Sequence, residues 1–176
     1  MGTKLAYLVF DTQLGWVGLL GSQMGLRKLV LPQPRPEQTL HFLNEFALKL
    51  QSSTLSGAGT GYFGNLPEEI KDYLAGKAVG FPNKLDLSKA SSFQKRVYQI
   101  TQSIPYGETK SYAWVAAELG MARAARAVGQ ALARNPLPIM IPCHRVICSN
   151  GNLGGFSGGI GWKQRLLEIE AKAFGI

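Results

Sequence analysis

The chain has 176 residues, 45% of them hydrophobic and 17% charged, which is typical of a globular protein with one or two packed domains. No apolar run approaches the length of a membrane span, and the first residues lead into a strand-like segment, so we expect neither a membrane anchor nor a signal peptide. The two cysteines lie five positions apart, which excludes a disulfide-stapled fold and favours a reducing compartment.

Positive charge is concentrated in the second half of the chain. The net charge is +8, and residues 1–90 carry nine Lys and Arg against seven Asp and Glu, whereas residues 91–176 carry ten against four. Such asymmetry is typical of a protein that binds a polyanion. Charge that serves only solubility explains the composition equally well, so charge alone does not decide.

The first half of the chain predicts a small α/β domain. Three strand-like segments with Gly-containing turns favour an antiparallel meander, at residues 4–10, 16–20 and 26–31. Pro36 begins a helix that runs to about Gln51, and Pro67 begins a shorter one that ends near Gly76. Residues 52–64 are rich in Ser, Gly and Thr and predict a loop that lacks the Lys-Ser/Thr pair of a phosphate-binding loop.

The second half predicts a helical domain, so the expected domains are residues 1–85 and 86–176. An apolar stripe predicts a helix that stops at Pro105, with Phe93, Val97, Ile100 and Ile104 on one face. Ser111 is expected to cap a second helix ending at Gly120, and a third runs from about Ala122 to Arg134. Two short helices joined by a tight turn are typical of a helix-turn-helix, although many helical proteins contain such pairs.

The third helix has two different faces. Its expected core face holds Ala124, Ala127, Val128, Ala131 and Leu132. The opposite face holds small residues beside arginines, namely Ala125, Gly129 and Ala133 with Arg123 and Arg126. A glycine costs a helix about 1 kcal/mol relative to alanine. Close approach to a nucleic-acid groove would offset that cost, and tight packing on another helix is the alternative.

The most informative stretch surrounds Cys143. The apolar run 139–141 predicts a short buried strand that Pro142 ends, which would hold the thiol on stiff backbone. A free thiol has a pKa near about 8.5 and needs help to act as a nucleophile. His144 and Arg145 can supply a base and positive potential. These cationic neighbours favour a reactive thiol over a buried structural cysteine.

The last predicted helix runs from Trp162 to Phe174. Its inward positions are Trp162, Leu166, Ile169 and Ala173. Glu170 falls on this apolar side together with Lys163, and a carboxylate seldom faces a core unless it is paired. Glu170 either orients His144, which would make a Cys–His–Glu relay, or forms a salt bridge with Lys163 or Arg145. The helical pattern leaves both arrangements open.

Together these residues resemble a known family. The motif Pro-Cys-His-Arg-Val at 142–146, preceded by Arg-Asn-Pro-Leu-Pro-Ile-Met-Ile and followed by Gly-Phe-Ser-Gly-Gly, is similar to that of the O6-alkylguanine-DNA alkyltransferases, or methylated-DNA–protein-cysteine methyltransferases. The resemblance is close over residues 92–172 and general over the first 85. It implies an α+β fold, with an RNase H-like N-terminal domain built on a three-stranded antiparallel sheet and a mostly helical, winged-helix-like DNA-binding domain.

The resemblance implies suicidal DNA repair without a cofactor. The Cys143 thiolate would take the alkyl group from guanine O6 in double-stranded DNA once per molecule. His144 would deprotonate Cys143 through a water, Glu170 would orient His144, and Asn135 would tie the recognition segment to the active site. The implied DNA-binding residues are Tyr112, Ala125, Arg126, Gly129 and Ser149. The implied substrate pocket consists of Tyr112, Val146, Phe156, Ser157 and Lys163.

The resemblance also implies minor-groove binding, with Arg126 inserted in place of a flipped nucleotide. We expect a monomer located with the DNA in the cytoplasm, or in the nucleus of a eukaryote, and cooperative assembly on DNA stays open. Phe156 stands where many members have tyrosine, which removes a hydroxyl from the pocket. The chain has no cysteine before 143, so we expect no structural zinc, and Cys148 is expected to be buried. A damage sensor, a cysteine hydrolase and a transcriptional regulator are the competing functions.

Overall fold

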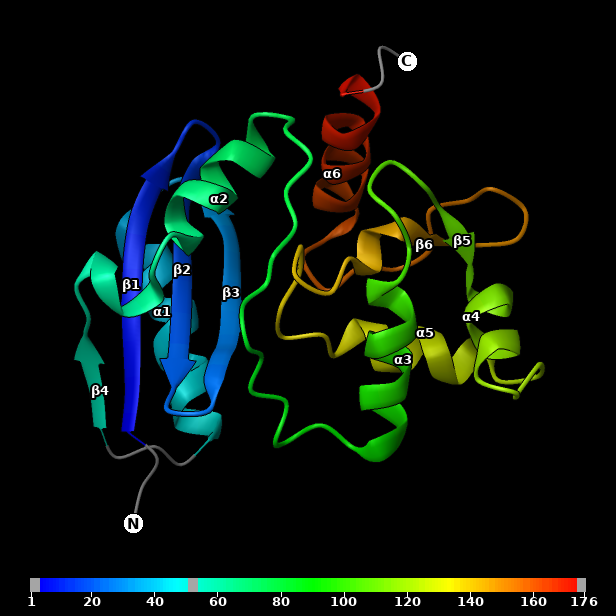
Figure 1. Cartoon of the computed structure of the whole chain (residues 1–176), viewed down its shortest axis with the longest axis horizontal. Helices are drawn as coiled ribbons and strands as arrows, with labels where there is room; N and C mark the ends of the chain where they lie inside the picture. Colours follow the sequence, from blue (N-terminus) through cyan, green and yellow to red (C-terminus); the bar gives the residue numbers. More distant parts are fainter. Residues whose placement is uncertain (1–3, 51–53, 174–176) are drawn as a thin grey trace. The chain divides into compact units, whose positions relative to one another are not determined.

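The computed structural model describes residues 4–50 and 54–173. The chain divides into two compact units, Met1–Leu87 and Ser88–Ile176 (Figure 1). The division lies two residues beyond the boundary expected from the sequence. Within the described ranges, no helix combines the length and the apolar character that crossing a bilayer requires.

The first unit is built on a sheet whose three predicted antiparallel strands are confirmed. They are β1 (Lys4–Thr12), β2 (Gly15–Ser22) and β3 (Gly25–Gln33). A fourth strand, β4 (Thr54–Gly57), pairs parallel with β1, and a 3₁₀ turn, η1 (Thr60–Phe63), follows it. The prediction of a loop over 52–64 was therefore wrong for this part. Such a short edge strand depends on the unpaired backbone edge of β1 more than on its own residues. Residues 51–53 lie outside the described residues.

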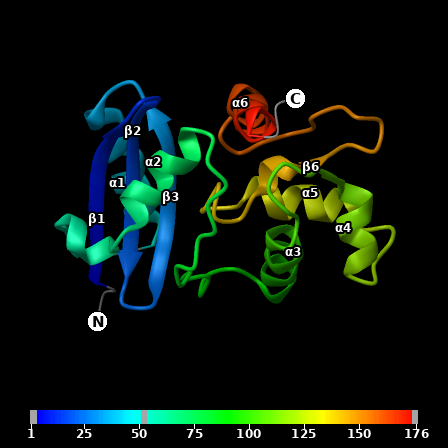
Figure 2. The same cartoon turned by 45° about the horizontal axis from the view of Figure 1, so that its top comes forward.

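Two helices cover opposite faces of this sheet, α1 (Pro36–Lys49) and α2 (Leu66–Leu74) (Figures 1 and 2). The buried face of α1 carries Thr39, Leu43 and Ala47, and the predicted end at Gln51 lies outside the described residues. A Cβ on Gly18 of β2 would lie 2.7 Å from Thr39 Cγ2, so this glycine lets α1 approach the sheet closely. The other side of α1 is solvated, and the His41 side chain there is 68% exposed.

The segment that leads out of the first unit is fixed to β3. Leu26 N donates to Lys84 O at 2.8 Å, and Asp86 N donates to Leu26 O at 2.7 Å. The buried Asp86 carboxylate accepts a hydrogen bond from Ser22 Oγ at 2.5 Å and pairs with Arg27 Nη1 at 3.1 Å. A buried ion pair thus anchors the end of the unit to its sheet.

The second unit is mostly helical, with a small two-stranded parallel sheet. Its elements are α3 (Ser92–Gln102), β5 (Lys110–Ser111), α4 (Tyr112–Glu118), α5 (Ala125–Ala133), η2 (Cys143–Arg145), β6 (Val146–Ile147) and α6 (Ile160–Lys172). As predicted, Ser111 caps α4, since its Oγ accepts from Trp114 N at 3.0 Å. The α3, α4 and α5 helices pack on one another.

The third predicted helix is shorter than its sequence pattern indicated. It begins at Ala125 instead of Ala122, because no side chain caps its start and a turn between Met121 and Ala124 precedes it. Only Val128, Ala131 and Leu132 of its predicted core face are buried inside it. Ala127 is exposed, so its core assignment was wrong. In α6 the predicted inward residue Ala173 is likewise exposed, just past the helix end, and Phe174 lies outside the described residues.

The apolar run before the cysteine is buried, but it is a turn and not the predicted strand. Ile141 N donates to Leu137 O at 2.9 Å, and Ile139 has a φ of 74°, which no strand contains. The physical reason is that Pro136, Pro138 and Pro142 lack backbone N–H donors, so a ladder cannot form here. The chain reaches Cys143 through this compact turn.

Candidate active site

The Cys143 thiol is buried and is held from the end of α5. Asn135, which follows that helix, donates from Nδ2 to Cys143 Sγ at 3.1 Å and to Ile141 O at 2.9 Å. Its Oδ1 accepts from Leu137 N at 2.9 Å. One amide side chain therefore joins the end of α5, both sides of the buried turn and the sulfur.

The resting state of Cys143 is the neutral thiol. Burial raises its pKa to about 11, while the hydrogen bond from Asn135 and the charge of Lys163 act in the opposite direction. The thiolate is the nucleophilic form of cysteine. Any nucleophilic chemistry at this sulfur therefore begins with removal of a proton by a nearby base.

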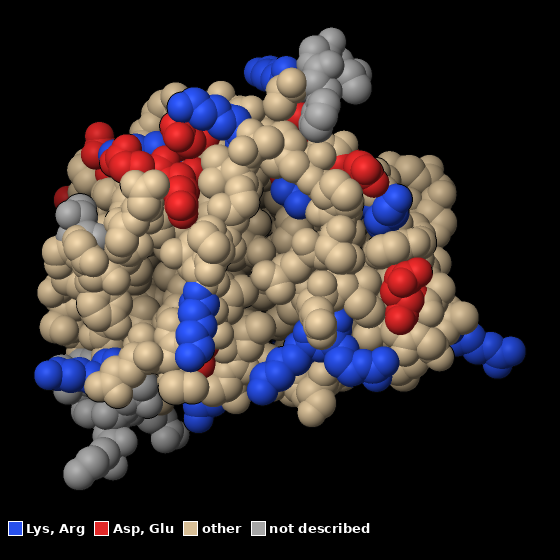
Figure 3. Space-filling view, in the orientation of Figure 1, with Lys and Arg blue, Asp and Glu red and all other residues tan. Residues whose placement is uncertain are grey.

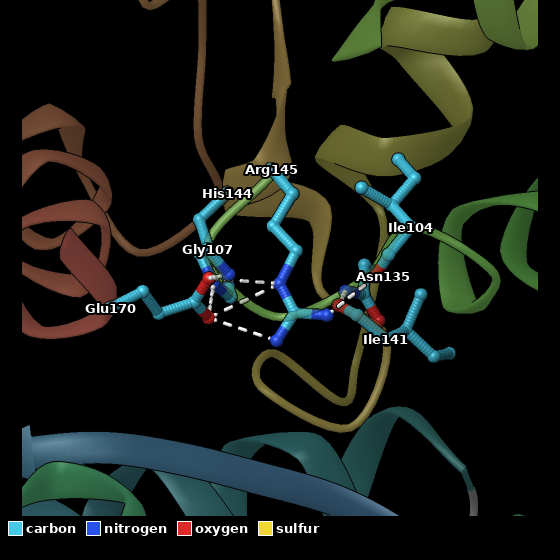
Figure 4. A network of polar contacts seen from close by, with 7 residues as sticks. All are labelled: Ile104, Gly107, Asn135, Ile141, His144, Arg145 and Glu170. Carbon is cyan, nitrogen blue, oxygen red and sulfur yellow. Dashed lines mark hydrogen bonds and ion pairs between the residues drawn. The ribbon is translucent and has the colours of Figure 1, made fainter. Parts of the chain in front are cut away.

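The neighbouring base is His144, which belongs to a buried network around Glu170 (Figure 4). His144 Nε2 lies 2.7 Å from Glu170 Oε1. Arg145 donates to the same carboxylate, with Nη2 2.9 Å from Oε1 and Nε 3.0 Å from Oε2. Gly107 N donates to Oε2 at 2.9 Å, and Arg145 Nη1 donates to Ile104 O at 2.7 Å. The structure thus contains both arrangements that the helical pattern left open for Glu170.

His144 is uncharged at rest. Burial lowers its pKa, and the hydrogen bond and charge of Glu170 oppose this effect, whereas the charges of Arg145 and Lys163 add to it. A neutral imidazole that donates Nε2–H to a carboxylate carries a lone pair on Nδ1. His144 can therefore accept a proton, as a general base must.

The cation that acts on the thiol is not the one expected from the sequence. Arg145 was expected to supply positive potential to Cys143, but its guanidinium pairs with Glu170. The charge that lowers the pKa of Cys143 is that of Lys163. The cysteine motif does not contain this lysine, because it comes from α6. Its place on the apolar side of that helix and the family resemblance both marked it, but neither assigned it an effect on the thiol.

Lys163 is fully buried and uses its ammonium group to hold three oxygens. Its Nζ donates to Val146 O at 2.6 Å, to the Tyr112 hydroxyl at 3.2 Å and to Gly155 O at 3.2 Å. The Tyr112 hydroxyl in turn donates to Gly155 O at 3.3 Å. Burial raises the pKa of Tyr112 to about 12, so the phenol keeps its proton. Tyr112, Val146 and Lys163, three of the predicted pocket residues, therefore lie together.

The remaining predicted pocket and loop residues lie nearer the surface. Phe156 is half-buried, and Ser149 and Ser157 are exposed. Cys148, expected to be buried, is partly exposed, because the glycine-rich loop covers it only in part. A Cβ on Gly154 of that loop would lie 3.2 Å from Cys148 Sγ and 2.9 Å from the Tyr112 hydroxyl.

The outer face of α5 presents small residues and an arginine. Arg126 and Ala133 are exposed, and Ala125 and Gly129 are half-buried. Among the described residues, a Cβ on Gly129 would meet only the Tyr112 ring, at an ordinary contact distance of 3.8 Å. Packing within the unit therefore does not require glycine here. Figure 3 shows Lys and Arg side chains along the lower edge of this unit.

The site contains no obvious metal centre. Over residues 4–50 and 54–173, no three His, Cys, Asp or Glu side chains gather closely enough to hold a metal ion. The chemistry that the described residues provide is nucleophilic: a buried thiol, a neutral imidazole base and a carboxylate that orients the base. The fold and the site therefore define a protein with one cysteine nucleophile, carried on a small helical unit.

Comparisons with known proteins identify the family within this class of cysteine proteins. Residues 92–172 match the 6-O-methylguanine DNA methyltransferase, DNA binding domain. The methylated-DNA–protein-cysteine methyltransferase of Mycolicibacterium paratuberculosis is 42% identical over 131 residues, which cover 71% of this chain and 79% of that protein. The Methanosarcina acetivorans protein of the same name is 32% identical over 164 residues, covering 93% of this chain and 97% of that protein.

A solved structure agrees with these relatives. The Mycobacterium tuberculosis OGT in complex with DNA has a TM-score of 0.78 and 35% identity, covering 96% of this chain and 94% of that one. The chain belongs to the family of methylated-DNA–protein-cysteine methyltransferases.

Proposed function

We propose that this chain repairs O6-alkylguanine in double-stranded DNA by transferring the alkyl group to Cys143 Sγ, once per molecule. The observation that carries the proposal is the buried neutral thiol, which Asn135 ties directly to the end of α5 at 3.1 Å. A nucleophile fixed to a helix with an arginine-bearing outer face suits chemistry on DNA. Relatives named for this activity, and one solved in complex with DNA, support the same conclusion.

The chemistry follows from the protonation states of the site. His144 takes the proton of Cys143 through a water, and the thiolate attacks the alkyl carbon on guanine O6. The C–S bond forms as the C–O6 bond breaks, and the electron pair of that bond stays on guanine. In this proposal the Tyr112 phenol gives a proton to the guanine ring and is reprotonated by solvent, while His144 releases the proton that it took from Cys143. The product is a thioether. Its sulfur carries no proton and cannot become a thiolate again, so each molecule reacts once.

The outer face of α5 is the proposed DNA-binding surface. Gly129, which packing does not require, and Ala125 let the helix approach the minor groove closely. Arg126 takes the place of the flipped nucleotide, and Ser149 contacts the backbone. Flipping a base costs a few kcal/mol, which is smaller for a damaged base. Phosphate contacts supply most of the affinity, so we expect weak sequence preference.

The flipped guanine would enter beside Lys163. Val146 O and Gly155 O, both held by the ammonium group of Lys163, line the proposed pocket with Phe156 and Ser157. A damage sensor that only binds lesions is the second candidate, but it has no use for an acceptor thiol. We further propose that the protein works as a monomer in the reducing compartment that holds the DNA, because a free reactive thiol persists there.

The proposal is tested by mass spectrometry after incubation with duplex DNA containing O6-methylguanine. We expect one methyl group on the Cys143 peptide, saturating at one per protein molecule. Cys143→Ser should bind the lesion without gaining mass, and Cys148→Ser, the matched control at the other cysteine, should react normally. Tight binding without a mass change in the unmodified chain would identify a sensor, and absence of lesion-dependent binding would refute the proposal.

A further inference from the structure

In the proposed mechanism His144, which Glu170 orients, takes the proton of Cys143, and Arg145 has no assigned role. This arginine is buried, with a side chain that is 10% exposed, and it follows His144 directly in the chain. Its Nη2 lies 2.9 Å from Glu170 Oε1, the same oxygen that lies 2.7 Å from His144 Nε2. A purely structural arginine would not need to share the oxygen that orients the base.

This sharing matters because of what an unshared carboxylate would do. A buried carboxylate next to a histidine favours the imidazolium form, since the two charges attract strongly where water is absent. A guanidinium stays charged under all ordinary conditions. Because Arg145 already neutralises Glu170, a proton added to His144 would place two cations against one carboxylate. The neutral imidazole is the favoured state in this arrangement.

We propose that Arg145 is a positioning residue that keeps His144 uncharged, with its ring proton on Nε2 donated to Glu170, so that Nδ1 carries the lone pair that takes the Cys143 proton. The role rests on the proposed function, because it concerns the base of that reaction. It also explains why the guanidinium of the cysteine motif pairs with Glu170 instead of with the thiol.

The other groups that face the network are consistent with this role. From α6, Glu170 favours the imidazolium form, whereas the Lys163 charge opposes it. From the connection between α3 and β5, Gly107 N donates to Glu170 Oε2 at 2.9 Å, which further satisfies the carboxylate. The Tyr106 ring lies 5.6 Å from the Arg145 guanidinium and helps to hold it. In η2 itself, Cys143 is a neutral thiol at rest, so Glu170 is the single carboxylate of the network drawn in Figure 4.

The first test uses the intact chain with one conservative change. The sequence contains two histidines, and the other, His41, is 68% exposed on α1. His41→Gln therefore leaves His144 as the only imidazole, and nitrogen NMR can report its charge and tautomer directly. We expect a neutral ring at about pH 7 with the proton on Nε2. An imidazolium at that pH, or a proton on Nδ1, would overturn the proposal even if alkyl transfer itself proceeds.

The second test removes the cation in the same His41→Gln background. In Arg145→Met, His144 should be charged near pH 7, and the single-turnover rate should fall about tenfold or more there and recover as pH rises, since each pKa unit is a factor of ten. Arg145→Lys keeps a positive charge. The acid limb of the pH–rate profile, where the single-turnover rate falls as His144 gains a proton, should therefore stay near its original pH. A purely structural role predicts the same fractional loss at every pH with His144 still neutral, and that result would refute the proposal.

The two tests remain informative if a variant is unstable or the reaction fails. The NMR measurement on His41→Gln needs no change at Arg145, so it decides the question even if Arg145→Met does not fold. Absence of alkyl transfer in the unmodified chain would refute the proposed function, whereas the charge and tautomer of His144 are measured without any substrate.

Discussion

Each of the two units buries an arginine–carboxylate pair, and the pairs differ in their third partner. In the first unit, Asp86 pairs with Arg27 and also accepts a hydrogen bond from the Ser22 hydroxyl, and the pair anchors the end of the unit to β3. In the second unit, Arg145 and Glu170 are joined by the His144 imidazole, directly beside the reactive thiol.

The comparison shows that a buried ion pair does not reveal its role by geometry alone. Both pairs have similar distances, 3.1 Å in the first unit and 2.9 Å in the second. A hydroxyl cannot change its charge near neutral pH, so the third group of the first pair has no protonation state for the pair to set there. An imidazole can, so the second pair also sets a protonation state. The chemistry of the third group decides between anchoring and catalysis.

The largest expected effect comes from removing each carboxylate charge. Glu170→Gln leaves a buried arginine without its partner and weakens the base, so stability should fall by about 3–5 kcal/mol and the transfer rate by about 10²–10⁴-fold. Asp86→Asn should cost similar stability while the single-turnover rate stays unchanged. Chemical unfolding and rapid-quench kinetics measure both quantities. If Glu170→Gln and Asp86→Asn slowed alkyl transfer equally, the two ion pairs would not differ in their roles.

A second prediction concerns the pH dependence of stability. Burial raises the pKa of Cys143 from 9.0 to about 11, so the folded chain holds this proton more tightly than the unfolded chain. The contribution of this proton to the free energy of unfolding is about 3 kcal/mol. It is fully present below about pH 9 and is lost as the pH rises to about 11. Urea unfolding of the unmodified chain and of Cys143→Ala should diverge in this window. Burial raises the pKa values of Tyr98 and Tyr112 to about 12 in both proteins, and only the smaller contribution of the Cys143 charge to these two values differs between them.

The smallest expected effect tests the third partner in the first unit. Ser22→Ala removes a hydrogen bond to the Asp86 carboxylate and should lower the free energy of unfolding by about 1–3 kcal/mol. The rate and the pH profile of alkyl transfer should stay the same. A shifted acid limb in this variant would mean that the ion pair of the first unit also influences the chemistry.

Much of the second unit could be predicted because its signals are local. The apolar stripe from Phe93 to Ile104 and the cap at Ser111 depend on neighbouring residues in the chain, and both agree with α3 and α4. The place of Glu170 on the apolar side of α6 followed from helical spacing alone. The cysteine motif also brought together, within a few residues of the chain, the thiol, the imidazole and the guanidinium that the structure buries in one unit.

Other features depend on distant contacts and could not be predicted. The choice of Arg145 over Lys163 as the ion-pair partner of Glu170 depends on where α6 meets η2. The short strand β4 exists because β1 offers an unpaired edge. The buried turn before Cys143 was mistaken for a strand because an apolar triplet looks the same in both, and the prolines around it were the signal that could have corrected the prediction.

The buried turn before Cys143 limits how the conformational stability of this protein can be raised. A β-branched residue at positive φ, as in Ile139 at 74°, costs roughly 1–2 kcal/mol of backbone strain. Asn135 holds the residues on both sides of it, Leu137 and Ile141, so the strained shape persists. Glycine at position 139 would relieve this strain, but it would also remove a side chain that is 3% exposed, and truncating a buried Ile to Ala already costs about 2–5 kcal/mol. Burial of the Ile139 side chain therefore outweighs the strain of its backbone, and the same residue keeps the turn in the shape that places the sulfur.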